Sequence, residues 1–215
     1  MFKNMGFQFG LYYSYNFTRK ISFNIQPGIA SYRYHYMTNY QLTDTISSSV
    51  FEREMYHAQR ISYLTIPVLI RYDIRASQFA PFIQAGLYTD FRLKAYKTIY
   101  YDNKIDQKVV KENNTSTGVD FSEQVFKNNI GLIAGGGFSF FTKHFSLNLE
   151  INYRYGFRPI IRNDNRFADI TGLTAQYLDV LDQHQLSNLS LQLTLMFPID
   201  NSLSLNILRR TKYYK

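Results

Sequence analysis

Few residues of this chain are spaced for catalysis. Asp182 and His184 precede Ser187 and Asn188, and Ser, His and Asp or Asn are the residue types that nucleophilic hydrolases combine. Enzymes embedded in membrane barrels gather such residues near the rim. We interpret this grouping as surface residues and predict no enzyme activity, with a barrel-embedded enzyme as the alternative.

The histidines and glycines give no metal or phosphate site. His35, His57, His144 and His184 lack the spacing of metal ligands and are interpreted as surface histidines. The triplet Gly135–Gly137 is followed by no Lys-Ser/Thr pair, so it is not a phosphate loop. Cysteine is absent, which excludes thiolate ligands. We therefore predict no cofactor and no bound metal.

Charged residues at alternate positions are the strongest candidates for a site. Glu150 and Arg154 share one parity of an alternating run, and Asp90, Arg92 and Arg71 share the polar parity of two others. If such runs are strands that close into a barrel, an ionised side chain enclosed in it must find a partner, because an isolated buried charge is costly. The sequence predicts a lumen polar network of these five residues, in which Glu150 is hydrogen bonded to Arg154 or Arg92.

Strands are the elements that would position these residues. In Gly6–Phe17, apolar residues occupy one parity and mostly small or polar residues the other, which is the pattern of a strand with two different faces. The alternation recurs along the chain and predicts about eight strands, each long enough to cross a bilayer with tilt. They span residues 5–17, 21–36, 61–74, 79–96, 128–141, 145–157, 186–197 and 202–212. No run of about 18 apolar residues exists, so a spanning helix is excluded.

The predicted connections alternate between short and long. The short ones are polar turns near residues 18–20, 75–78, 142–144 and 200–201, and the long ones are 37–60, 97–127 and 157–186. Outer-membrane barrels have short turns on the periplasmic side and long loops outside. We therefore expect the three long connections at the cell surface.

The two faces of the strands distinguish lipid from water as the surrounding solvent. A soluble barrel would expose a face rich in Lys and Glu, whereas here the polar face is mostly Gly, Ser, Asn, Gln and Thr. Aromatic residues make up 17% of the chain, and tyrosines gather near predicted strand ends, as in an interfacial girdle. Residues 1–215 therefore predict a single all-β domain, a closed antiparallel up-and-down transmembrane β-barrel. A narrow passive pore and a soluble ligand-binding barrel remain as alternatives.

Two adjacent segments resemble a known family. "YLTIPVLIRYDI" (Tyr63–Ile74) followed by "PFIQAGLYTDFRL" (Pro81–Leu93) is similar to the central strand pair of the PorT-like outer-membrane β-barrel family of Bacteroidota. The resemblance implies a place in the bacterial outer membrane and a role as an accessory of type 9 protein secretion. Lipid and other envelope or secretion proteins are the implied partners. The net charge is +8, and basic residues mark the short turns and crowd the C-terminal end. These positions fit anionic head groups better than nucleic acid.

Three further expectations concern particular segments. Pro67 is expected to mark a break in strand pairing, because proline has no N–H to donate. Residues 202–212 are expected to close the barrel between the strands at 186–197 and 5–17, with a missing upstream strand or an unpaired tail as the alternatives. No signal peptide opens the sequence, so we expect a leader that has been removed or that lies outside this sequence.

Overall fold

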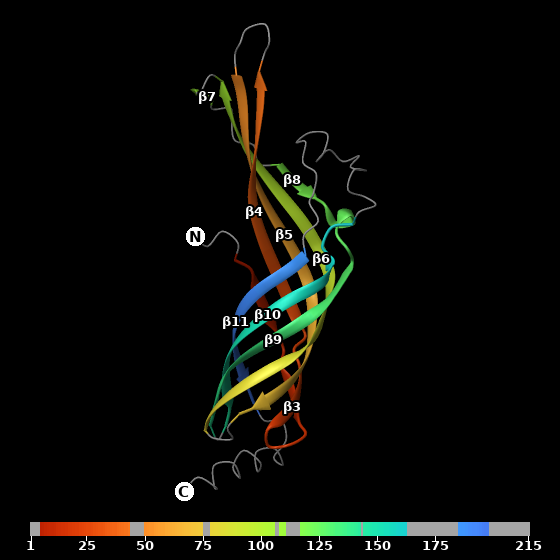
Figure 1. Ribbon diagram of the computed structural model, residues 1–215, viewed down its shortest axis with the longest axis vertical. Coiled ribbons are helices and arrows are strands. Elements are labelled where there is room, and N and C mark those ends of the chain that lie inside the picture. Colours follow the sequence, from red (N-terminus) through yellow and green to blue (C-terminus); the bar gives the residue numbers. More distant parts are fainter. Residues whose placement is uncertain are drawn as a thin grey trace.

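The protein is an antiparallel β-sheet that curls strongly towards a barrel (Figure 1). The computed structural model describes residues 5–43, 50–74, 78–105, 108–110, 117–142, 144–162 and 185–197. Its strands are β1 (Phe7–Gly10), β2 (Tyr13–Asn16), β3 (Ile21–Ile25), β4 (Gly28–Thr43), β5 (Val50–Asp73), β6 (Phe79–Ile105), β7 (Lys108–Val110), β8 (Thr117–Asp120), β9 (Asn128–Phe141), β10 (Ser146–Pro159) and β11 (Gln185–Met196). A short 3₁₀ turn, η1 (Ser122–Gln124), follows β8. The all-β, up-and-down prediction is confirmed.

Strand order determines what can close the sheet. The order is β1-β4-β5-β6-β9-β10-β11, and every neighbouring pair is antiparallel. The two edge strands, β1 and β11, therefore run in the same direction and cannot pair with each other in an antiparallel ladder. One further strand of opposite direction is needed between them. Residues 202–212, the expected closing strand, lie outside the described part of the chain.

Burial alternates along the spanning strands as their composition predicts. In β10, the polar residues Asn148, Glu150, Asn152 and Arg154 are buried, whereas Leu149, Ile151 and Tyr153 point outwards and are exposed. The same outward band continues over the neighbouring strands with Leu87, Leu132, Leu191 and their equivalents. A continuous apolar outer face around a polar interior is the arrangement that lipid requires. Among the described residues, no helix is long and apolar enough to cross a membrane.

Three strands extend far beyond the rest of the sheet. β4, β5 and β6 continue upwards past β9–β11 in Figure 1, and the β4–β5 ladder runs without interruption from Gly28↔Thr65 to Thr43↔Val50. The prediction of a long loop at 37–60 is therefore wrong, and residues 97–105 of the second predicted loop extend β6. Sequence alternation failed here because a strand whose outer face meets water has no need for apolar residues on that face.

The ladder on one side of β5 is interrupted near Pro67. Pairing of β5 passes from β4 to β3 between Gly28↔Thr65 and Ile25↔Val68, while Pro67 remains in register with Tyr88 on β6. The carbonyl of Pro67 accepts from the Gln26 N–H at 3.0 Å. In an antiparallel ladder the N–H and C=O of one residue point to the same side, so the missing N–H of Pro67 falls on the interrupted side. The expected break at Pro67 is confirmed.

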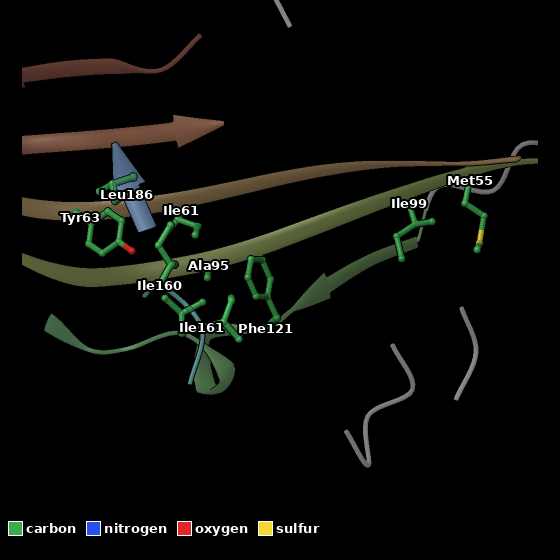
Figure 2. Packing of buried hydrophobic residues seen from close by; sticks show 10 residues of the cluster. Met55, Ile61, Tyr63, Ala95, Ile99, Phe121, Ile160, Ile161 and Leu186 are labelled. Atoms are coloured by element: carbon green, nitrogen blue, oxygen red, sulfur yellow. The ribbon is translucent and has the colours of Figure 1, made fainter. Parts of the chain in front are cut away.

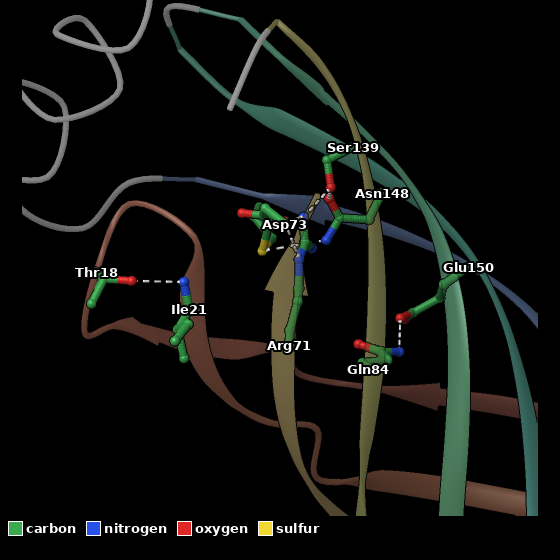
Figure 3. Close-up of polar contacts among 9 residues, drawn as sticks. Thr18, Ile21, Arg71, Asp73, Gln84, Ser139, Asn148 and Glu150 are labelled. Carbon is green, nitrogen blue, oxygen red and sulfur yellow. Dashed lines mark hydrogen bonds and ion pairs between the residues drawn. The ribbon is translucent and has the colours of Figure 1, made fainter. Parts of the chain in front are cut away.

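Threonine side chains close two of the short turns. Thr18 Oγ1 accepts from the Ile21 N–H at 3.0 Å (Figure 3), and Thr142 Oγ1 accepts from the Phe145 N–H at 3.1 Å. Both turns lie at the end of the sheet opposite the long extension (Figure 1). These two short turns are thus at the opposite end from the extended parts of β4, β5 and β6 (Figure 1).

Closure of the sheet by residues 202–212 can be tested by cross-linking. Leu193 points outwards on β11. A neighbouring strand that keeps its apolar face outwards must therefore pair Leu193 with an odd-numbered apolar residue. We expect a disulfide between Leu193→Cys and a cysteine at Leu203, Leu205 or Ile207, measured by mobility on non-reducing gels.

Cysteines at Ser204 and Asn206 are the matched controls, because they would face the interior and should not react with Leu193→Cys. Absence of a disulfide at all three odd positions would contradict closure by residues 202–212.

Candidate functional site

An ion pair lies in the interior near the short-turn end. Arg71 Nε and Nη2 donate to Asp73 Oδ1 at 2.8 and 2.7 Å, and both side chains are almost fully buried (Figure 3). The same guanidinium donates to Ser139 Oγ and lies 3.6 Å from the ring centroid of Phe82. Ser139 in turn donates to Asn148 Oδ1 at 2.6 Å. Four strands, β5, β6, β9 and β10, thus converge on one arginine.

The next layer contains Glu150 and amide side chains. Gln84 Nε2 donates to Glu150 Oε2 and, at 2.8 Å, to Asn152 Oδ1. Sequence reasoning expected Arg154 or Arg92 at this position, and the structure places Gln84 there instead. Arg71 lies close enough for its charge to act on Glu150, without a direct contact. The difference comes from register: Gln84 is opposite Gly135, and Gly135 is opposite Asn152, so β9 contributes no side chain between them.

Arg154 organises a third polar layer. Its Nη1 donates to the Tyr32 hydroxyl at 2.6 Å and its Nη2 to Thr65 Oγ1 at 3.0 Å. Its guanidinium also lies 4.9 Å from the ring centroid of Tyr88. Asp90, which is fully buried, is near enough for its charge to interact with Arg154. These two residues of the predicted network therefore share one layer, whereas Glu150 belongs to another.

Arg92 lies at the end of the polar interior and not within it. A register shift on β6 between the pairs Tyr63↔Arg92 and Ser62↔Lys94 leaves Leu93 without a partner on β5. The buried parity of β6 changes there, from Tyr88 and Asp90 below to Ala95 and Lys97 above. Arg92 is half-buried, and its Nη1 donates to the Val125 carbonyl at 2.6 Å. A bulge of this kind re-aims side chains, which sequence parity cannot anticipate.

An apolar cluster covers the polar layers on the side of the long extension. Figure 2 shows Tyr63 and Ile61 of β5, Ala95 of β6 and Leu186 of β11 close to Phe121, Ile160 and Ile161 from the segments that follow β8 and β10. Each of these side chains is at most 6% exposed. The Phe126 N–H donates to the Ile160 carbonyl at 2.9 Å, which ties the two segments together. We call these seven residues the apolar cap.

Beyond the cap, in the extension, His57 and Lys97 surround Tyr36. The rings of Tyr36 and His57 stack with centroids 4.5 Å apart, His57 Nε2 is 2.7 Å from Thr38 Oγ1, and Lys97 donates to the Tyr36 hydroxyl. Burial, followed by the nearby charge of Lys97, lowers the pKa of His57 to about 4. Burial lowers the pKa of Lys97 to about 7.

The other candidate residues show no catalytic geometry in the described part. His57 is buried and not at the surface, while His35 and His144 are exposed. Asp182 and His184 of the hydrolase-like grouping lie outside the described residues, and Ser187 is exposed at the start of β11. No group of three His, Cys, Asp or Glu residues that could hold a metal ion occurs among the described residues.

Sequence reasoning missed Asp73 and the neutral polar members of the interior layers. Asp73, Gln84, Thr65, Tyr32, Ser139 and Asn148 supply most of the partners found there. Asp73 has a clear signal, since it follows Arg71 by two residues on the same face of a strand. For the amides and hydroxyls the signal is weaker, because neutral polar residues are common on every inward face of the barrel.

Comparison with known proteins gives one match. A family described as "Outer membrane protein beta-barrel domain" matches residues 2–162. No curated protein and no solved structure matches the chain.

The Arg71–Asp73 pair should dominate the stability of the interior. We expect Arg71→Met to lower the free energy of unfolding by about 3 to 5 kcal/mol, because it leaves the Asp73 carboxylate buried without its cation. Urea unfolding of the protein in detergent, followed by far-UV circular dichroism, would measure this loss.

The double variant Arg71→Met/Asp73→Asn is the control for this pair. It removes both charges together and should recover part of the lost stability. A double variant no more stable than Arg71→Met would show that the uncompensated charge is not the cause.

The cluster around His57 should make the stability of the protein pH-dependent. Because the pKa of His57 is lowered from 6.5 to about 4, the unfolded chain takes up a proton between these values while the folded chain does not. Stability should therefore fall as the pH decreases from about 6.5 to 4. We expect His57→Phe, which keeps a stacking ring, to reduce this fall in thermal unfolding curves recorded at several pH values. If the unfolding temperatures of the two proteins fell equally with decreasing pH, the attribution of this pH dependence to His57 would be wrong.

Proposed function

The chain belongs to the outer membrane protein β-barrel domain family. From this membership and the resemblance to the PorT-like family, we propose that it is a non-enzymatic outer-membrane barrel that assists type 9 protein secretion. As a member of this family, the protein lies in the bacterial outer membrane, where its exposed apolar residues contact lipid. The proposed role in secretion goes beyond this location in the outer membrane. The observation that carries the proposal is the filled interior combined with a long sheet that projects beyond it.

The filled interior argues for a supporting role over transport or catalysis. Three polar layers centred on Arg71, Glu150 and Arg154 occupy the lumen, and the apolar cap lies above them. A barrel of about eight strands has just enough internal space for its own side chains. A narrow passive pore would need a continuous polar path, and the apolar cap opposes one.

The projecting strands supply a surface for a protein partner. β4, β5 and β6 carry backbone structure well beyond the apolar band, where strands serve no purpose in crossing lipid. In this class of protein, long connections face outwards and short turns face the periplasm. We therefore assign the extension, with the cluster of Tyr36, His57 and Lys97, to the cell surface.

The resemblance of residues 63–74 and 81–93 to the PorT-like family suggests which process the surface serves. These residues form the central β5–β6 pair, whose register runs from Asp73↔Phe82 to Tyr63↔Arg92 before the bulge. The distinctive Pro67 lies in this pair and coincides with the break in the β3–β4 side of the ladder. The resemblance therefore concerns the strands around which the rest of the sheet is arranged.

A shortened extension tests the secretion role. The β4–β5 hairpin can be cut at the pair Thr38↔Met55 and joined by Asn-Gly, which keeps the register of the remaining strands. In a strain that lacks the native protein, we expect the full chain to restore export of type 9 cargo. The shortened chain should reach the outer membrane without restoring export. Immunoblots of cargo in periplasm and medium would measure both.

Ile151→Leu, a conservative change on the lipid face, is the matched control and should restore export fully. Normal export in the absence of the protein would overturn the secretion role. Steady ion conductance of the purified wild-type protein in planar bilayers would overturn the filled lumen and favour the pore.

A further inference from the structure

A cluster of basic side chains lies on the outer wall where the apolar band ends. Arg33 of β4 is directly opposite Arg60 of β5, and Lys94 of β6 is directly opposite Ser62, two residues further along the same outward face of β5. Arg60 and Lys94 are exposed and Arg33 is half-buried. We call Arg33, Arg60 and Lys94 the basic triad.

Two positive charges that face each other across paired strands call for a compensating anion. Side chains directly opposite in a ladder lie close together, and like charges in such positions are destabilising. Within the described part of the chain, Asp120 lies near enough for its charge to interact with Lys94. Among the described residues, no ion pair between an acidic side chain and Arg33 or Arg60 is observed.

Two hydroxyl groups and an unpartnered guanidinium atom complete the site. Ser31 and Ser62 are directly opposite each other beside the two arginines and share their face. Ser31 is 3% exposed, yet its Oγ has no hydrogen-bond partner, and neither does the buried Nε of Arg33. Three cations and two hydroxyls on one patch form a donor set that suits a phosphate group.

The height of the triad on the barrel identifies the source of that phosphate. Ile29, Leu64 and Leu93 on the same three strands are exposed apolar residues on one side of the triad. Tyr56, Tyr96 and Tyr100 lie at its level or beyond it, and tyrosines mark the membrane interface. The triad therefore lies at head-group depth, and on the orientation proposed above it faces the outer leaflet.

We propose that Arg33, Arg60 and Lys94, with Ser31 and Ser62, bind a phosphate group of an outer-leaflet glycolipid on the wall formed by β4, β5 and β6. The lipid phosphate offsets the like charges of the two arginines and fixes the barrel at a definite depth. The site stands immediately below the extension, so the bound lipid steadies the base of the surface assigned to a partner. The inference rests on the proposed orientation and not on the secretion role.

Thermal unfolding in a nonionic detergent tests the site with the full chain. Diphosphoryl lipid A, the same lipid after removal of its phosphates, and inorganic phosphate are added separately. We expect only the phosphorylated lipid to raise the unfolding temperature of the wild-type protein. Arg33→Gln and Arg60→Gln should each require about tenfold more lipid for the same rise, as expected for the loss of one charge-assisted contact.

The lipid-free proteins distinguish a binding site from a structural role. Because each substitution also removes one of two opposed charges, the variants without lipid should be at least as stable as the wild type. Arg158→Gln, which changes an exposed arginine of β10 at the same end of the barrel, is the matched control and should respond to lipid as the wild type does. Lys94→Gln serves as the second variant if an arginine substitution prevents folding.

Four results would overturn the inference. They are an unchanged lipid response in the triad variants, an equal loss in Arg158→Gln, an equal effect of the dephosphorylated lipid, and the same rise with inorganic phosphate alone. Binding is measured on the purified protein, whereas the secretion role is measured in cells. A negative result for lipid binding therefore does not contradict the secretion role, and a negative result for secretion does not contradict lipid binding.

Discussion

Backbone hydrogen bonding in an apolar medium is the constraint on which the rest of this structure depends. Within a bilayer no water is available for unpaired N–H and C=O groups, so spanning strands must pair on both sides. The described sheet meets this requirement between β4 and β10, each of which has a neighbour on both sides. The parallel directions of β1 and β11 leave room for one strand of opposite direction. Even the proline in β5 is placed so that its missing N–H falls at an existing break.

The same constraint explains the composition of the interior. Once alternate residues face lipid, the remaining ones must fill a narrow space, and charged groups there need partners. The structure separates them into layers: Arg71 with Asp73, Glu150 with Gln84, and Arg154 with Tyr32 and Thr65. Gly135 and Gly137 face this space from β9. A Cβ at either position would meet the β10 backbone within 2.2 Å, so larger residues there would push β9 and β10 apart.

Beyond the apolar band the requirement changes, and so does the sheet. β4, β5 and β6 continue into water, where the outward face no longer has to be apolar, and the interior is filled by the apolar cap and then by Tyr36, His57 and Lys97. The bulge at Leu93 marks this change on β6. The basic triad lies at the same level, so a change of solvent, a change of strand geometry and a concentration of charge coincide.

Local periodicity was sufficient for the parts of this protein that contact lipid. Alternation placed Arg71, Asp90, Glu150 and Arg154 on inward-facing positions of their strands, because a period of two separates faces whatever the neighbouring strand is. It did not extend to the water-exposed halves of β4, β5 and β6, where the contrast between faces disappears.

Which side chains meet was decided only by the tertiary structure. Contact depends on the register between strands and on the bulge at Leu93, and neither leaves a periodic signal in a single strand. The register placed Gln84 beside Glu150, Arg154 beside Tyr32, and Arg33 opposite Arg60. Sequence alone therefore determined the faces of the strands and the solvent that each face meets, while the pairing of strands determined the sites.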